Sequence, residues 1–133
     1  MGQKVNPVGF RVGINRGWDS VWFAKKKEYG NYLIEDYKIR QYIKNNVGNS
    51  GVSKVQIERT SKKCIVTIYT SRPGFVIGKK GSDIEKIKKN LGKFSKHELS
   101  LNIKEVKKPE LNSFLVAENI AQQLVKKEVI LKK

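Results

Sequence analysis

Between two apolar runs the chain reads Arg72-Pro73-Gly74-Phe75-Val76-Ile77-Gly78-Lys79-Lys80-Gly81-Ser82. Glycine allows a backbone to turn and to approach a ligand closely, where a side chain would block the approach. The paired lysines add positive charge at the tip, and a helix that begins after Gly81 points its first N–H groups toward the same place. The stretch therefore predicts a loop, formed by Gly78, Lys79, Lys80 and Gly81, that binds a phosphodiester backbone.

A helix is expected directly after this loop. Residues 82–85 have the S-x-x-E spacing of a capping box, and Gly92 is a natural stop. Ile84, Ile87 and Leu91 lie at helical spacing and form a core-facing stripe. This orientation turns a row of lysines toward solvent or a ligand: Lys86, Lys89 and Lys93.

The segments around the loop predict an α+β fold. Residues 29–46 carry an apolar stripe at helical spacing, and the alternation around Val55 and Ile57 indicates a strand. Residues 63–70 are rich in β-branched residues and would form a hairpin with that strand. Residues 75–77 fit one helical turn, and residues 99–103 alternate as a third strand. The predicted order is helix, strand, strand, short helix, loop, helix, strand.

Two segments flank this predicted core of residues 29–107. Residues 1–28 are glycine-containing, basic and without a sustained period, which indicates an extended arm. The arm carries aromatic residues that either stack on bases or anchor it to the core: Phe10, Trp18, Trp22 and Phe23. Residues 108–133 should form a helix whose apolar line needs a surface to pack on: Val116, Ile120 and Leu124.

The charge of the chain favours a polyanionic partner. With 28 Lys+Arg against 12 Asp+Glu, the 133 residues carry a formal net charge of +16. The alternative is a solvated basic surface that serves solubility alone. The sequence has no run of twenty apolar residues, so we expect no transmembrane helix and no membrane partner. Cys64 is the only cysteine, which excludes an intrachain disulfide and fits a reducing, cytoplasmic compartment.

Catalytic and metal-binding motifs are not found in the sequence. His97 is the only histidine and falls in a polar stretch, where we expect an exposed turn residue. The spacing G-x-x-x-x-G-K-[ST] does not occur, which argues against nucleotide hydrolysis. Asp83 and Glu85 are better explained as charges that complement a helix N-terminus than as metal ligands. We therefore expect no enzyme, no cofactor, no metal site and no small-molecule substrate.

At this point the residues resemble a known family. The segment Val76-Ile77-Gly78-Lys79-Lys80-Gly81, in its α-β-β-α-α-β setting, is similar to a type II KH domain, whose G-x-x-G loop clamps about four nucleotides. Over essentially the full chain, further motifs resemble the bacterial-type small-subunit ribosomal protein three family. These are Met1 to Pro7, Gly9-Phe10-Arg11 with Gly13, Trp18 to Ala24, Arg72-Pro73-Gly74, Lys108 to Leu111, Val116-Ala117-Glu118 and Ile120 to Leu124.

The resemblance implies a type II KH fold, with a three-stranded sheet packed on helices, in the head of the small ribosomal subunit. It implies small-subunit rRNA, mRNA near the entry channel and neighbouring head proteins as partners, on a cytoplasmic or organellar ribosome of bacterial type. The rRNA-facing arm residues would be Lys4, Arg11, Lys25, Lys26 and Lys27. The residues near the mRNA path would be Lys126, Lys127, Lys132 and Lys133.

Family members usually continue into a second α/β domain, so the resemblance makes residues 108–133 the start of a truncated C-terminal domain. Two other functions stay open at this point. One is a stand-alone KH module that regulates RNA, although such a module needs no tryptophan-bearing basic arm. The other is a lysine-based lyase acting on damaged nucleic acid, which requires a lysine of lowered pKa.

Overall fold

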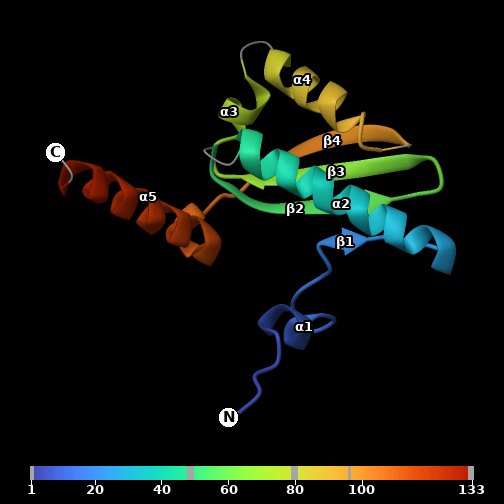
Figure 1. Ribbon diagram of the computed structural model, residues 1–133, viewed down its shortest axis with the longest axis horizontal. Helices are drawn as coiled ribbons and strands as arrows, with labels where there is room; N and C mark the ends of the chain where they lie inside the picture. The colour runs from blue at the N-terminus through green and yellow to red at the C-terminus, as the bar shows by residue number, and fades with distance from the viewer. Residues whose placement is uncertain (1, 48–49, 79–80, 96, 132–133) are drawn as a thin grey trace.

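The computed structural model describes residues 2–47, 50–78, 81–95 and 97–131. Its elements follow the chain in this order: α1 (Pro7–Arg11), β1 (Ser20–Val21), α2 (Lys26–Val47), β2 (Val52–Arg59), β3 (Lys63–Thr70), α3 (Pro73–Ile77), α4 (Ser82–Leu91), β4 (Glu98–Glu105), the 3-10 helix η3 (Pro109–Leu111) and α5 (Ser113–Leu131). From α2 to β4 this is the predicted order of a type II KH fold. Figure 1 shows α1 and α5 projecting from the body that these elements form.

The sheet has four strands in the order β1-β2-β3-β4, so the expectation of three strands is wrong. β2 and β3 form the predicted antiparallel hairpin, and β4 runs parallel to β3. The additional strand β1 comes from the segment predicted as an extended arm without regular structure. It has only two residues, paired in parallel with Ile57 and Glu58, which is too short for an alternating pattern in the sequence.

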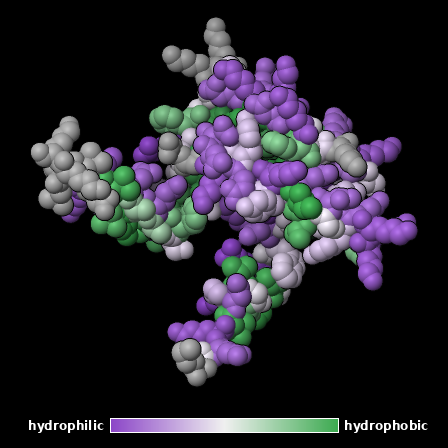
Figure 2. Space-filling model, in the orientation of Figure 1, coloured by the Kyte–Doolittle hydropathy of each residue, from purple (hydrophilic) through white to green (hydrophobic). Residues whose placement is uncertain are grey.

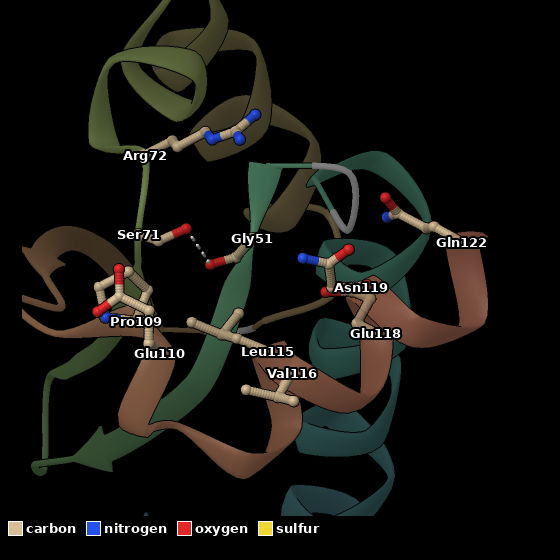
Figure 3. Close-up of a pocket in the computed structure, with 10 residues that line it drawn as sticks. All are labelled: Gly51, Ser71, Arg72, Pro109, Glu110, Leu115, Val116, Glu118, Asn119 and Gln122. Carbon is tan, nitrogen blue, oxygen red and sulfur yellow. Dashed lines mark hydrogen bonds between the residues drawn. The ribbon is translucent and has the colours of Figure 1, made fainter.

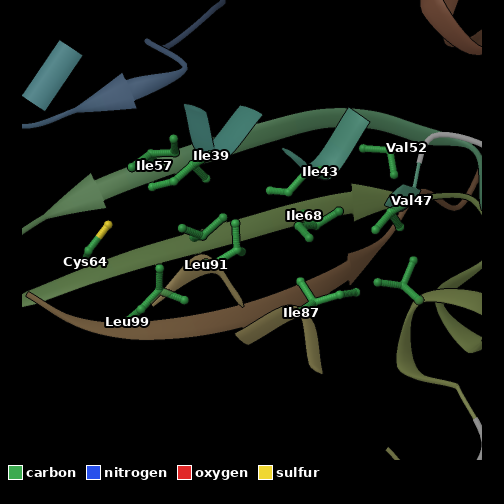
Figure 4. Close-up of a cluster of buried hydrophobic side chains, with 12 residues drawn as sticks. Ile39, Ile43, Val47, Val52, Ile57, Cys64, Ile68, Ile87, Leu91 and Leu99 are labelled. Carbon is green, nitrogen blue, oxygen red and sulfur yellow. The ribbon is translucent and has the colours of Figure 1, made fainter. Parts of the chain in front are cut away.

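The core lies between one face of the sheet and the helices α2, α3 and α4 (Figure 4). Ile39 and Ile43 of α2 are fully buried against Ile57 of β2. β3 runs through the middle of this face and buries alternate residues, beginning with Cys64 and Val66. Burying an isoleucine or leucine side chain contributes about 1.5–3 kcal/mol, so these residues stabilise the domain that carries the loop.

Helix α4 begins one residue away from the predicted cap. Gly81 takes the N-cap position with φ +80°, and Ser82 is the first helical residue. The predicted capping box is therefore wrong, because the left-handed glycine shifts the register and leaves the serine inside the helix. The helix ends after Leu91 as predicted, although Gly92 has a right-handed φ of −59° there.

Two further helices differ from the expectation. α1 was not predicted, although Asn6 and Pro7 are a recognisable start: the Asn6 side chain accepts from the backbone N–H groups of Val8 and Gly9. α5 was predicted, together with a line of apolar residues that was expected to pack against another surface. Within the described ranges that line stays exposed, with 41% of Val116 and 60% of Leu124 accessible.

Candidate nucleic-acid interface

The glycine loop joins α3 to α4 at one end of the sheet. Gly78 ends α3 with φ +72°, and Gly81 caps α4 in the left-handed region, so both ends of the loop have backbone that favours glycine. A β-carbon on Gly78 would also collide with the Asp83 carboxylate. Lys79 and Lys80, the predicted tip, lie outside the described residues.

Helix α4 presents an exposed basic face beside this loop. Ile87 and Leu91 are buried, whereas Lys86, Lys89 and Lys93 are exposed on or just beyond the helix. The Lys86 Nζ lies 3.4 Å from Asp83 Oδ1, so part of its charge is balanced locally. In Figure 2 hydrophilic residues cover most of the body of the molecule, including the part formed by α4.

The arm is fastened to the domain by a buried carboxylate that sequence reasoning missed. Asp36 of α2 is 3% exposed and accepts from Ser20 Oγ and from Trp22 Nε1, each at 2.8 Å. Arg59 Nη2 donates to Asp36 at 2.6 Å, and Arg59 Nη1 donates to Glu35 at 2.9 Å. These partners lie 14 to 24 residues apart in the chain, so no local pattern announces them.

The charged core of this network affects two pKa values. Burial alone would lower the pKa of Arg59, but its hydrogen bonds to Asp36 and Glu35 and the negative charge of Asp36 raise that pKa on balance, so the guanidinium stays charged. Burial raises the pKa of the Cys64 thiol, although the nearby Arg59 opposes the effect. Cys64 is therefore a buried apolar neighbour of the network and is poorly suited to act as a nucleophile.

The four aromatic residues of the arm differ in their surroundings: one packs against the domain and three are exposed. Trp22 anchors the arm, since its ring also lies 5.4 Å from that of Tyr29 and 5.7 Å from that of Tyr32. The other three are exposed, with 92% of Phe23 accessible, and remain open to stacking. They are Phe10, Trp18 and Phe23.

The basic residues predicted for the arm are all exposed: Lys4, Arg11, Lys25, Lys26 and Lys27. Helix α2 begins earlier than expected and places two of them, Lys26 and Lys27, in its first turn. Arg11 donates from Nη1 to the carbonyl of Pro7 at 3.1 Å. The arm meets the domain beside the turn between β2 and β3, while the glycine loop follows the far end of β3. Eight residues of strand separate these ends by about 25 Å, so the loop and Lys25 to Lys27 are not brought together.

Comparison with known proteins agrees with this geometry. The family described as KH domain matches residues 38–111, which include the hairpin, the glycine loop, α4 and β4. The chain belongs to the KH domain family. The match begins inside α2 and ends at the last residue of η3, so it excludes the arm and all of α5.

Several relatives of this KH protein are named small ribosomal subunit protein uS3. It is 81% identical over 127 residues to the small ribosomal subunit protein uS3 of Pelagibacter ubique, which covers 96% of this chain and 56% of that protein. It is 60% identical to uS3 of Cereibacter sphaeroides and 59% identical to uS3 of Parvibaculum lavamentivorans, each over 93% of this chain and 52% of the relative. The predicted resemblance to small-subunit ribosomal protein three is confirmed, and the chain spans about half the length of these relatives.

Beyond the matched KH residues, α5 carries two of the four remaining predicted lysines. Lys126 and Lys127 are exposed on this helix, and Lys132 and Lys133 lie outside the described residues. A pocket of about 460 Å³ lies between α5 and η3 on one side and the residue before β2, Gly51, on the other (Figure 3). Arg72, Asn119 and Gln122 contribute polar groups to its wall, and no local sequence pattern predicts the pocket, because its sides come from distant segments.

His97 differs from its prediction as an exposed turn residue. Its ring is half-buried and meets the edge of Tyr32 at a centroid distance of 5.8 Å, because the arm and α2 pack against the turn before β4. Among the described residues, no group of three or more His, Cys, Asp or Glu side chains is placed to hold a metal ion. Over the same residues, no helix has the length and apolar character to cross a membrane.

Proposed function

We propose that this KH protein is a structural constituent of the small ribosomal subunit and that it binds small-subunit rRNA. The observation that carries the proposal is the pair of left-handed glycines, Gly78 and Gly81, between two helices beside an exposed lysine face. The names of its relatives favour the ribosome over a stand-alone KH regulator.

The glycine loop and α4 form the main RNA contact in this proposal. Phosphates approach the backbone closely at Gly78 and Gly81, and the N–H groups of the first turn of α4 face them. Lys79 and Lys80 of the loop contribute positive charge in this proposal, while Lys86, Lys89 and Lys93 neutralise further phosphates along the strand. Each neutralised phosphate releases counterions, so the affinity falls steeply with salt.

The arm provides a second rRNA contact through Lys4, Arg11 and Lys25 to Lys27. The Asp36 network supports this role, because it fixes the point where the arm leaves the domain. Residues 1–28 then serve as the rRNA-binding arm, residues 29–107 as the KH domain, and residues 108–133 as the beginning of a second domain.

The C-terminal lysines contact mRNA near the entry channel, and the exposure of Lys126 and Lys127 on α5 supports their part of this proposal. Neighbouring proteins of the subunit head are the remaining partners. The protein acts by binding and is not an enzyme. Its location is the ribosome, in a bacterial cytoplasm or in an organelle of bacterial descent.

The RNA contact is tested with the triple variant Lys86→Ala, Lys89→Ala, Lys93→Ala. Affinity for a single-stranded RNA should fall, and the slope of log K against log salt should become shallower by about 2, at roughly 0.7 for each lost phosphate contact. The matched control changes three exposed lysines elsewhere: Lys38, Lys44 and Lys107. Equal salt slopes for the two triple variants would refute the α4 contact.

The ribosomal assignment is tested by gradient sedimentation of cell extracts. We expect the tagged chain in the small-subunit fractions, and expect it to leave them when the subunits are dissociated. A chain found only in the light fractions, but still binding RNA, would support the stand-alone regulator instead.

A further inference from the structure

A pocket of about 470 Å³ lies at the opposite end of the sheet from the glycine loop. Its volume falls within the range of about 300–1,000 Å³ that small ligands occupy. Its wall combines aromatic side chains with hydrogen-bonding and cationic groups: Phe23, Lys25, Tyr32, Arg59, Ser61 and His97. We propose that this pocket binds one unpaired nucleotide of RNA, with its base against the aromatic residues and its phosphate near Lys25. The proposal rests on the RNA binding proposed above.

The aromatic wall is held in place before any ligand enters. The Arg59 guanidinium lies 4.8 Å from the centroid of the Tyr32 ring, and Trp22 meets the same ring edge-on. The His97 ring also packs against Tyr32, at a centroid distance of 5.8 Å. Because Arg59 is tied to Asp36 and Glu35, the position of Tyr32 is fixed by the network that anchors the arm. Because this surface is already ordered, the protein loses little conformational freedom when a base stacks on it.

Phe23 is almost fully exposed, unlike the other aromatic residues around the pocket. It follows the anchored Trp22 directly, yet 92% of it is accessible. Exposing a large aromatic ring beside an ordered aromatic pocket is unfavourable in water, and base stacking would remove that cost. Stacking platforms of this kind bind single strands without requiring a particular base, since every base has a π-face.

The charge around the pocket favours a phosphate. Arg59 is paired with both Glu35 and Asp36, so two carboxylates and one guanidinium leave this buried cluster with a net charge of −1. Lys25 lines the pocket, and three further exposed lysines adjoin lining residues in the chain: Lys26, Lys27 and Lys62. Together these four positive charges exceed the negative charge of this cluster and of Glu28, the acidic residue of the wall. A docking protein would instead need a broad apolar surface, whereas this wall offers one exposed ring among polar groups.

Crosslinking tests the site on the full chain. The probe is a ten-nucleotide oligouridylate that carries one 4-thiouridine, irradiated with the protein and mapped by mass spectrometry. We expect crosslinks in two regions, one at residues 72–93 and one at the pocket, in peptides that contain Phe23 or Tyr32. Phe23→Ala should remove the pocket crosslink and weaken RNA binding by about tenfold. Phe23→Tyr should retain the pocket crosslink and the RNA affinity, because tyrosine keeps the aromatic ring.

Phe10→Ala is the matched control, because Phe10 is an exposed phenylalanine of the same arm that does not line the pocket. It should leave the pocket crosslink unchanged. Crosslinks confined to residues 72–93 would overturn the pocket proposal and leave the loop contact standing, whereas no binding by the unaltered chain would overturn both. If Phe23→Ala kept full RNA affinity but lost a protein neighbour in assembled subunits, the pocket would belong to a protein partner.

Discussion

Gly78 shows how one residue determines the shape of the RNA-binding loop. Its φ of +72° is unfavourable for residues with a β-carbon, and that carbon would also meet the Asp83 carboxylate. We expect Gly78→Val to lower the free energy of unfolding by about 1–3 kcal/mol and to weaken RNA binding. Urea unfolding followed by circular dichroism measures the first effect, and an RNA titration measures the second.

Gly74→Ala is the control for this substitution. Gly74 lies within α3, its φ is not in the left-handed region, and a β-carbon there has no neighbour within 4 Å. Alanine should preserve or slightly raise stability, because it suits a helix better than glycine. If both variants unfold at the same urea concentration, the left-handed backbone at Gly78 is not required.

Asp36 is the residue on which the attachment of the arm depends. Removing its carboxylate would leave the Arg59 charge buried with Glu35 as its remaining acidic partner. We expect Asp36→Ala to destabilise the protein by about 3–5 kcal/mol, as breaking a buried ion pair does. Glu98→Ala is the comparison, because the exposed Lys63–Glu98 pair at 3.9 Å should contribute at most about 1 kcal/mol. Thermal unfolding measures the stability of both variants. Equal losses of stability would contradict a special role for Asp36.

At the scale of elements, local patterns identified the helices α2 to α5 and the hairpin, but they missed what distant residues determine. The Ile84, Ile87 and Leu91 stripe predicted α4, because helical spacing alone places a core face. The capping box failed because the conformation of Gly81 depends on the loop. Strand β1 is held in place because Asp36 and Arg40 hydrogen-bond the Ser20 hydroxyl. Both partners lie on α2, far from β1 in the chain. The network around Tyr32 was missed for the same reason.

The first turn of α4 leads to a prediction about charge. Asp83 complements the positive end of the helix dipole, but its carboxylate lies next to Gly78, where phosphates are proposed to approach. Asp83→Asn should therefore tighten RNA binding by about threefold and cost about 0.3–1 kcal/mol of stability. Glu118→Gln on α5 removes the same charge away from the loop and should change neither quantity. Fluorescence anisotropy at low salt compares the two, and equal affinities would contradict a phosphate path beside Asp83.

At the scale of the whole molecule, the arm is in part a structural piece of the domain. Ser20 and Trp22 satisfy Asp36, and the carbonyl of Asp19 accepts from Arg40 at 2.9 Å. Residues before Gly17 lie outside this network, although Lys4 and Arg11 there are proposed to contact rRNA. Stability and RNA binding should therefore be lost at different points as the arm is shortened.

Two deletions separate these effects. Removing residues 2–17 keeps β1 and Trp22, so the melting temperature should stay within a few degrees while rRNA affinity falls through the loss of Lys4 and Arg11. Removing residues 2–24 also deletes two hydrogen bonds to the Asp36 carboxylate, each contributing about 1.5–3 kcal/mol. That deletion should lower the melting temperature by about 10 °C or more, since 1 kcal/mol shifts a domain of this size by roughly 3–6 °C. Circular dichroism on heating measures both, and equal melting temperatures would mean that the domain folds without its arm.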